Sequence, residues 1–156
     1  MINNTFQLLN KDWKFKRYSE ESWHVAKVPG CVHQDLFMNN LISDPFFRDN
    51  ESKLQWIMES KWVYRLLFKP TEEILSKKNK TLSLFGIDTY ADIHLNGEKI
   101  LSTNNMFHSW QIDVSCLLKS DINELKILFH SPIKAVKSVM EKKEYKLPAD
   151  NDQAGD

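Results

Sequence analysis

Residues 85–107 read FGIDTYADIHLNGEKILSTNNMF, and this stretch carries the strongest fold signal in the chain. Small or apolar side chains alternate with polar ones over residues 91–95, and a second extended pattern covers residues 98–102. Asn96 and Gly97 stand between the two patterns. Asn-Gly readily supplies the two positive φ angles of a type I′ turn, so this stretch predicts a β-hairpin.

Extended segments of the same kind recur through the chain. Trp62, Tyr64 and Leu66, for example, alternate with Val63, Arg65 and Leu67, which gives a pattern of period two. Nine such segments are predicted to be strands: residues 5–9, 13–17, 23–28, 61–68, 81–86, 91–95, 99–103, 110–114 and 124–130. Many short strands of this kind predict an all-β sandwich.

Helix signals are few, and we expect one or two short helices flanking the sandwich. One is predicted over residues 31–40, directly after the breaker Pro29-Gly30. A second is predicted over residues 133–145, where Ser131-Pro132 supplies a start signal and an apolar stripe follows at helical spacing.

Six ordered segments of this chain resemble the first domain of β-mannosidases in glycoside hydrolase family 2. The first is the GxDTYAxxxLNG run of the hairpin with the following NMF. The others are Val28-Pro29-Gly30, Val32-His33 with Asp35-Leu36, the run DPFFRDNE at residues 44–51, Gln55-Trp56-Ile57 and Trp62-Val63-Tyr64-Arg65. The resemblance covers nearly the whole chain.

This resemblance implies a galactose-binding-like jelly-roll β-sandwich over residues 1–146, with residues 147–156 as a loop cut off before further domains. It implies that both catalytic carboxylates lie on a (β/α)8 barrel of the same polypeptide, that no catalytic residue lies in this chain, and that the substrate is a β-mannoside. The chain alone is then expected to be an inactive fragment, whose open sheet edge leads to self-association.

The composition of the chain excludes other partners. Lys+Arg and Asp+Glu both number 21, so a basic face for nucleic acid is not expected. No apolar window approaches the ~20 residues of a membrane span, and residues 1–10 lack the features of a secretion signal. We expect no membrane partner, and the cytoplasm and the periplasm both remain open.

Residues 44–56 (DPFFRDNESKLQW) are the candidate binding segment, because aromatic rings stand there beside carboxylates and amides, as in sugar recognition. The resemblance implies that this domain lends polar side chains to the rim of the mannose pocket, and the candidates are Asp49, Asn50 and Glu51. In the alternative interpretation, Phe46, Phe47 and Trp56 merely pin the loop to the sandwich.

No cofactor and no metal is expected. The five histidines show no zinc spacing, and Asn104, Asn105 and Asp113 match no calcium loop. Cys31 and Cys116 fit two free thiols better than a disulfide framework. Two other functions stay open at this point: a stand-alone carbohydrate-binding module, and the matching domain of a β-galactosidase or β-glucuronidase.

Overall fold

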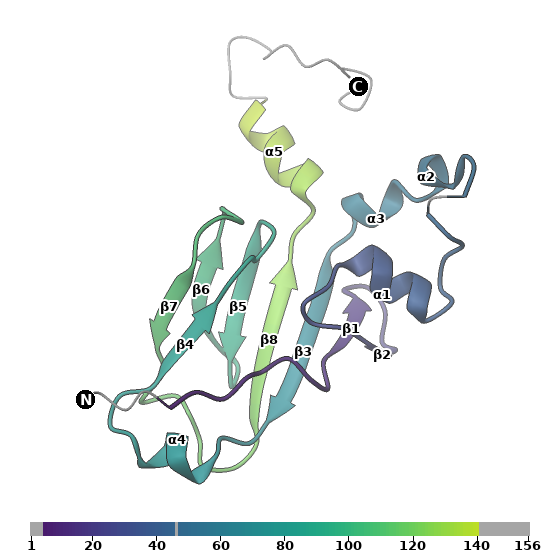
Figure 1. Cartoon of the computed structure of the whole chain (residues 1–156). Helices are drawn as coiled ribbons and strands as arrows, with labels where there is room; N and C mark the ends of the chain where they lie inside the picture. Colours follow the sequence, from purple (N-terminus) through teal and green to yellow (C-terminus); the bar gives the residue numbers. More distant parts are fainter. Residues whose placement is uncertain (1–4, 46, 141–156) are drawn as a thin grey trace.

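The structure is a computed structural model that describes residues 5–45 and 47–140, apart from the side chains of residues 51 and 138–140 (Figure 1). The strands are β1 (Lys14–Arg17), β2 (His24–Val25), β3 (Trp62–Phe68), β4 (Thr81–Leu84), β5 (Ala91–Leu95), β6 (Glu98–Thr103), β7 (Trp110–Asp113) and β8 (Asn123–Phe129). The helices are α1 (Val32–Met38), α2 (Asn50–Lys53), α3 (Trp56–Glu59), α4 (Glu72–Ser76) and α5 (Pro132–Met140).

The strands form two antiparallel sheets. The larger sheet has the order β2-β1-β3-β8-β5-β6, and the smaller consists of β4 and β7. Figure 1 shows β4 and β7 lying beside the β5–β6 end of the larger sheet, with α1 at its β1 end. The strands at the centre of the larger sheet, β3 and β8, come from distant parts of the sequence.

The core lies on one face of the larger sheet. Phe15, Tyr64 and Ile93 are buried there with Leu84 of β4, whereas the alternate positions of the same strands face outward. Phe15 stacks against Tyr64 with the ring centroids 5.6 Å apart. The period-two pattern of the sequence therefore identifies the buried face correctly.

The predicted hairpin is confirmed as β5 and β6. Asn96 has φ 54° and Gly97 has φ 89°, so both turn residues take the left-handed conformation. The Asn96 side chain also joins the turn to the segment before β8, because its Nδ2 donates to the Leu117 carbonyl and to Asn123 Oδ1, both at 2.8 Å. The turn is thus fixed by backbone preference and by tertiary contacts.

The prediction of a strand at residues 5–9 is wrong. This segment belongs to neither sheet, and the Gln7 side chain joins it to the chain between β3 and α4. Gln7 donates from Nε2 to the Lys69 carbonyl and accepts at Oε1 from the Thr71 N–H, each at 3.0 Å. The strand predicted at residues 23–28 is reduced to the two residues of β2.

The number of helices was underestimated. Five occur among the described residues, and α2, α3 and α4 are segments of four or five residues that show no extended apolar stripe. The structure bears out α1 inside the predicted 31–40 range. The start of α5 is at Pro132, whereas the predicted end of that helix and the predicted loop at 147–156 lie outside the described residues.

Two further expectations concern single features. Cys31 and Cys116 are free thiols, as predicted, and both are exposed. No helix in the described part of the chain has the length and apolar character needed to cross a membrane.

Candidate functional site

The predicted binding segment forms the connection between α1 and β3, and it folds into a loop followed by α2 and α3 (Figure 1). Asp49 lies in the turn directly before α2, Asn50 begins that helix, and Glu51 is its second residue. Arg48 has φ 53°, which turns the chain sharply into the helix. The structure thus brings the backbones of the three candidate residues together on one short, surface-lying turn.

The side chains of Asp49 and Asn50 have different surroundings. The Asp49 side chain is exposed and has no hydrogen bond to another described residue. The Asn50 side chain is half-buried, and its Nδ2 donates to the Asp44 carbonyl at 2.9 Å, which closes the loop. Asn50 therefore braces the segment, whereas the Asp49 side chain is exposed to solvent.

Of the two rings of this segment that the structure describes, the alternative interpretation holds for Trp56 and not for Phe47. Trp56 packs against the core and lies 5.9 Å from the Trp62 ring centroid, with the Arg17 guanidinium 5.1 Å from its own. Phe47, in contrast, is 57% exposed, and Phe46 lies outside the described residues. Trp56 anchors the loop, and Phe47 is presented to solvent.

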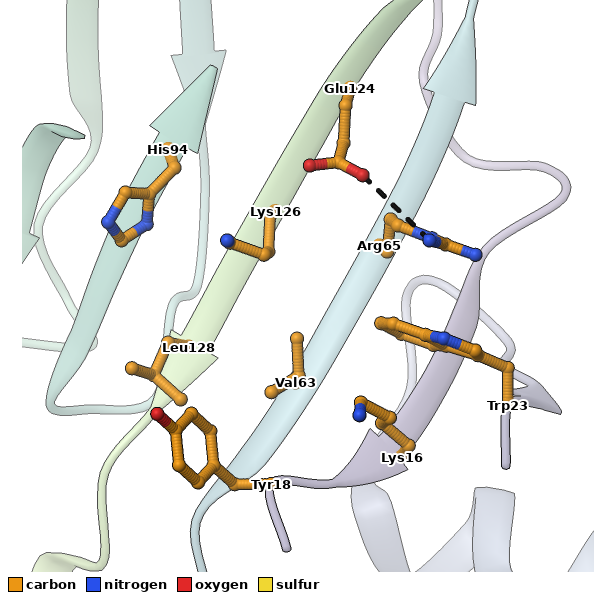
Figure 2. Close-up of a pocket in the computed structure, with 9 residues that line it drawn as sticks. All are labelled: Lys16, Tyr18, Trp23, Val63, Arg65, His94, Glu124, Lys126 and Leu128. Carbon is orange, nitrogen blue, oxygen red and sulfur yellow. Dashed lines mark ion pairs between the residues drawn. The ribbon is translucent and has the colours of Figure 1, made fainter. Parts of the chain in front are cut away.

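A second surface, which the sequence analysis missed, is a groove of about 480 Å³ on the outer face of the larger sheet (Figure 2). Its lining residues come from four strands and from the segment between β1 and β2: Lys16, Tyr18, Trp23, Val63, Arg65, His94, Glu124, Lys126 and Leu128. We call this surface the outer groove. Three of its lining side chains are Lys or Arg and one is Glu, so the groove carries a positive charge although the whole chain is electrically neutral.

The sequence did contain a signal for this groove. In β3 and β8 the polar partners of the apolar alternation are Arg65, Glu124 and Lys126, so the period-two pattern alone places them on the outer face. What the pattern does not give is the order of the strands. Only the pairing of β1, β3, β8 and β5 brings these side chains to one place.

Two cations of the groove lie against one aromatic ring, that of Trp23. The Arg65 guanidinium carbon lies 4.1 Å from the Trp23 ring centroid, and Lys16 Nζ lies 5.3 Å from the same ring. The ion pair between Arg65 and Glu124 has an N–O distance of 3.9 Å, which is too long for a hydrogen bond. Stacking on Trp23 therefore orients Arg65 without occupying its N–H donors.

The expected absence of metal ligands can be compared with the side-chain contacts. Within residues 5–45 and 47–140, no three His, Cys, Asp or Glu side chains are grouped closely enough to hold a metal ion. Asn105 Oδ1 accepts from the Phe107 N–H at 2.9 Å. Asp113 Oδ1 accepts from the Ser115 hydroxyl at 2.6 Å, and the Ser115 hydrogen bonds keep the pKa of Asp113 below its usual value.

Comparison of the sequence with known families identifies the family of the chain. Residues 13–155 match the family model described as glycosyl hydrolase 2 galactose-binding domain-like. The β-mannosidase B of Aspergillus terreus is 41% identical over 120 residues, and that of Thermothelomyces thermophilus is 35% identical over 126 residues. These alignments cover 74% and 79% of this chain but only 14% and 15% of the relatives, so the chain spans about a seventh of their length.

Solved structures agree with the sequence comparison. The β-D-mannosidase of Dictyoglomus thermophilum superposes with a TM-score of 0.88 at 41% identity, covering 92% of this chain and 18% of that one. An exo-chitosanase of Amycolatopsis orientalis superposes with a TM-score of 0.68 at 16% identity, covering 82% of this chain and 17% of that one. The second likeness shows a shared fold only.

Proposed function

The chain belongs to the glycosyl hydrolase 2 galactose-binding-like domain family, and we propose that it is the N-terminal β-sandwich domain of an exo-β-mannosidase. Its role is to support a catalytic (β/α)8 barrel in the same polypeptide, which removes terminal β-D-mannose from mannosides. The observation that carries this proposal is the 41% identity to a β-mannosidase structure across 92% of the chain. Chains that share only the fold and act on other sugars are less than 20% identical.

The segment at residues 44–56 is the part of the domain through which we propose that it shapes the rim of the substrate pocket. The exposed Asp49 carboxylate and the solvent-facing Phe47 ring support this role, because a carboxylate and an aromatic face are the groups that bind sugar hydroxyls and C–H faces. Asn50 contributes by holding the loop closed through Asp44. Glu51 completes the set as the next residue of α2.

A domain exchange tests the proposed function. In the β-mannosidase of Dictyoglomus thermophilum, the matching domain is replaced by residues 1–156 of this chain, and hydrolysis of nitrophenyl β-mannoside is measured. We expect the chimaera to remain active, because the two domains superpose closely. The matched control carries the corresponding domain of the β-glucuronidase from the same organism, which shares the fold at 14% identity, and is expected to be inactive.

Two further measurements separate the alternatives. The chain by itself is expected to show no hydrolysis of nitrophenyl β-mannoside, β-galactoside or β-glucuronide, because the resemblance puts both carboxylates that a retaining glycosidase needs on the barrel. Titration with mannose and manno-oligosaccharides is expected to show no tight binding by the chain alone. An inactive chimaera, together with tight mannose binding by the chain, would instead indicate a stand-alone carbohydrate-binding module.

A further inference from the structure

A row of basic side chains crosses the outer face of the larger sheet, where the register holds them side by side, and Arg65, Lys126 and His94 of this row line the outer groove. Lys14 pairs with Arg65, Arg65 pairs with Lys126, and Lys126 pairs with His94, so one residue from each of four neighbouring strands contributes. Directly opposite residues of antiparallel strands project from the same face, and like charges at such positions destabilise a sheet. An anion bound along such a row would therefore offset the repulsion.

The described residues supply little of that compensation. Lys126 has no acidic partner within ion-pair distance among them, and Glu124, the ion-pair partner of Arg65 within the described part of the chain, is 3.9 Å away. The His94 ring adds an unused polar atom, because its Nδ1 is buried and has no hydrogen-bond partner in the described structure. Figure 2 shows Arg65, Lys126 and His94 following one another across the sheet.

We infer that the outer groove binds a carboxylate-bearing oligosaccharide through Arg65, Lys126 and His94. Arg65 is suited to donate two parallel N–H bonds to a carboxylate, because its guanidinium rests 4.1 Å from the Trp23 ring centroid and makes no hydrogen bond to the described residues. Val63 and Leu128 form an apolar floor against which the C–H face of a sugar ring can pack. This surface is separate from the segment at residues 44–56, and the inference does not depend on the proposed catalytic function.

The spacing of the row favours an acidic saccharide over an acidic peptide. Neighbouring strands lie ~4.8 Å apart, so the backbone positions of the row follow one another at this spacing. Successive side chains on one face of an extended peptide are about 6.6 Å apart, since each residue rises about 3.3 Å and alternate residues point away. The row is therefore more closely spaced than the acidic side chains of an extended peptide, and the apolar floor of Val63 and Leu128 adds a surface for sugar C–H groups.

Calorimetric titration of the protein with tri-galacturonate at low salt tests the inference, with β-1,4-mannotriose and tri-glutamate as comparison ligands. We expect tri-galacturonate to bind, mannotriose not to bind, and the affinity to fall as salt is raised, because charges at an open surface are screened. Lys126→Gln should weaken binding about tenfold, as expected for one charge-assisted hydrogen bond. Lys78→Gln, an equal charge change on an exposed residue outside the groove, should leave the affinity unchanged.

The outcomes distinguish the alternatives. If tri-glutamate binds at least as tightly as tri-galacturonate, the ligand of the groove is an acidic peptide and not a saccharide. If Lys78→Gln weakens binding as much as Lys126→Gln, the affinity depends on the net charge of the protein and not on the groove. Absence of tri-galacturonate binding, with an unchanged melting temperature in both variants, would overturn the inference. Hydrolysis of nitrophenyl β-mannoside by the chimaera is a separate readout, and Lys126→Gln should not alter it.

Discussion

The Tyr64 hydroxyl donates a hydrogen bond of 2.7 Å to Oδ2 of Asp35, and this bond joins α1 to the centre of the larger sheet. Asp35 is only 1% exposed, and its Oδ1 accepts from the Lys27 N–H at 2.8 Å. A buried carboxyl thus has a partner on each oxygen. Because β3 contributes Tyr64 to the core, the same contact orients the helix over the β1 end of the sheet.

Removing the hydroxyl should leave Asp35 with a buried oxygen that has lost this partner. Tyr64→Phe is expected to lower the free energy of unfolding by about 1–3 kcal/mol, measured by chemical denaturation. The control is Tyr18→Phe, since Tyr18 is 60% exposed and should change stability by less than about 0.5 kcal/mol. Equal effects of the two substitutions would show that the bond to Asp35 contributes nothing.

Burial raises the pKa of Asp35 above its usual value of 3.8, and the hydrogen bonds from Lys27 and Tyr64 offset this only in part. A carboxyl whose pKa is raised in the folded state contributes its stability below the unfolded pKa and loses it as the pH rises through the folded pKa. Asp35→Asn removes this titration. The stability of the parent relative to Asp35→Asn should therefore fall as the pH rises from about 4, and a relative gain would contradict the assignment.

Asp92 should show the opposite dependence. Lys99 donates to its Oδ1 at 2.6 Å, and hydrogen bonds from Ser102 and His130 add to this, so the pKa of Asp92 lies well below 3.8. Its contribution is present above the unfolded pKa and is lost as the pH falls through the folded pKa. The parent should lose stability relative to Asp92→Asn on acidification below about pH 4, measured by thermal denaturation. A difference independent of pH would mean that the ion pair is screened by solvent.

The β5–β6 turn depends on backbone conformation alone at Gly97. A Cβ at this position would meet no atom within 4 Å, but φ is 89°. Gly97→Val should therefore destabilise the protein by about 1–3 kcal/mol through strain at a β-branched residue. Gly97→Asn should cost less, because Asn tolerates positive φ. Equal melting temperatures of parent and Gly97→Val would show that the turn relaxes without cost.

Asn123 is the centre of a buried amide network. It is fully buried, and its Nδ2 donates to the Lys119 and Asp121 carbonyls at 2.9 and 2.8 Å. Asn123→Leu leaves these groups without their partner and should cost at least about 1–3 kcal/mol in chemical denaturation. Asn79→Leu, on an exposed loop, serves as the control. A loss of stability no larger than that of the control would show that the Asn123 hydrogen bonds do not stabilise the turn at residues 119–123.

The proposed pocket rim predicts different kinetic and stability effects at neighbouring positions. In the active chimaera, Asp49→Asn and Glu51→Gln should lower kcat/KM, with Asp49→Asn changing stability by less than about 0.5 kcal/mol. Asn50→Ala should also lower stability by about 0.5–1.5 kcal/mol, because it removes the bond to Asp44. Normal kinetics in all three variants would show that these residues do not contribute to the pocket rim and only stabilise the loop.

Local signals in the sequence predicted the hairpin and the face of each long strand. Asn96-Gly97 specifies its turn through the φ angles of two adjacent residues, and the alternation around Tyr64 reports which side chains avoid water. Both properties depend on near neighbours in the chain. The stretch at residues 5–9 has the same local appearance, but Gln7 ties it to Lys69 and Thr71 and no strand forms.

By itself, the sequence determined the all-β class, the turn, the buried face and the family resemblance, because each rests on residue order or short-range periodicity. Only the tertiary structure decided that β1, β3, β8 and β5 are neighbours, and hence that Arg65, Lys126 and His94 stand in one row. Pairing between distant strands is selected by the packing of the whole core and the closure of long loops. The physical reason is that the charge of a surface depends on which strands meet, and this is a property of the assembled sheet.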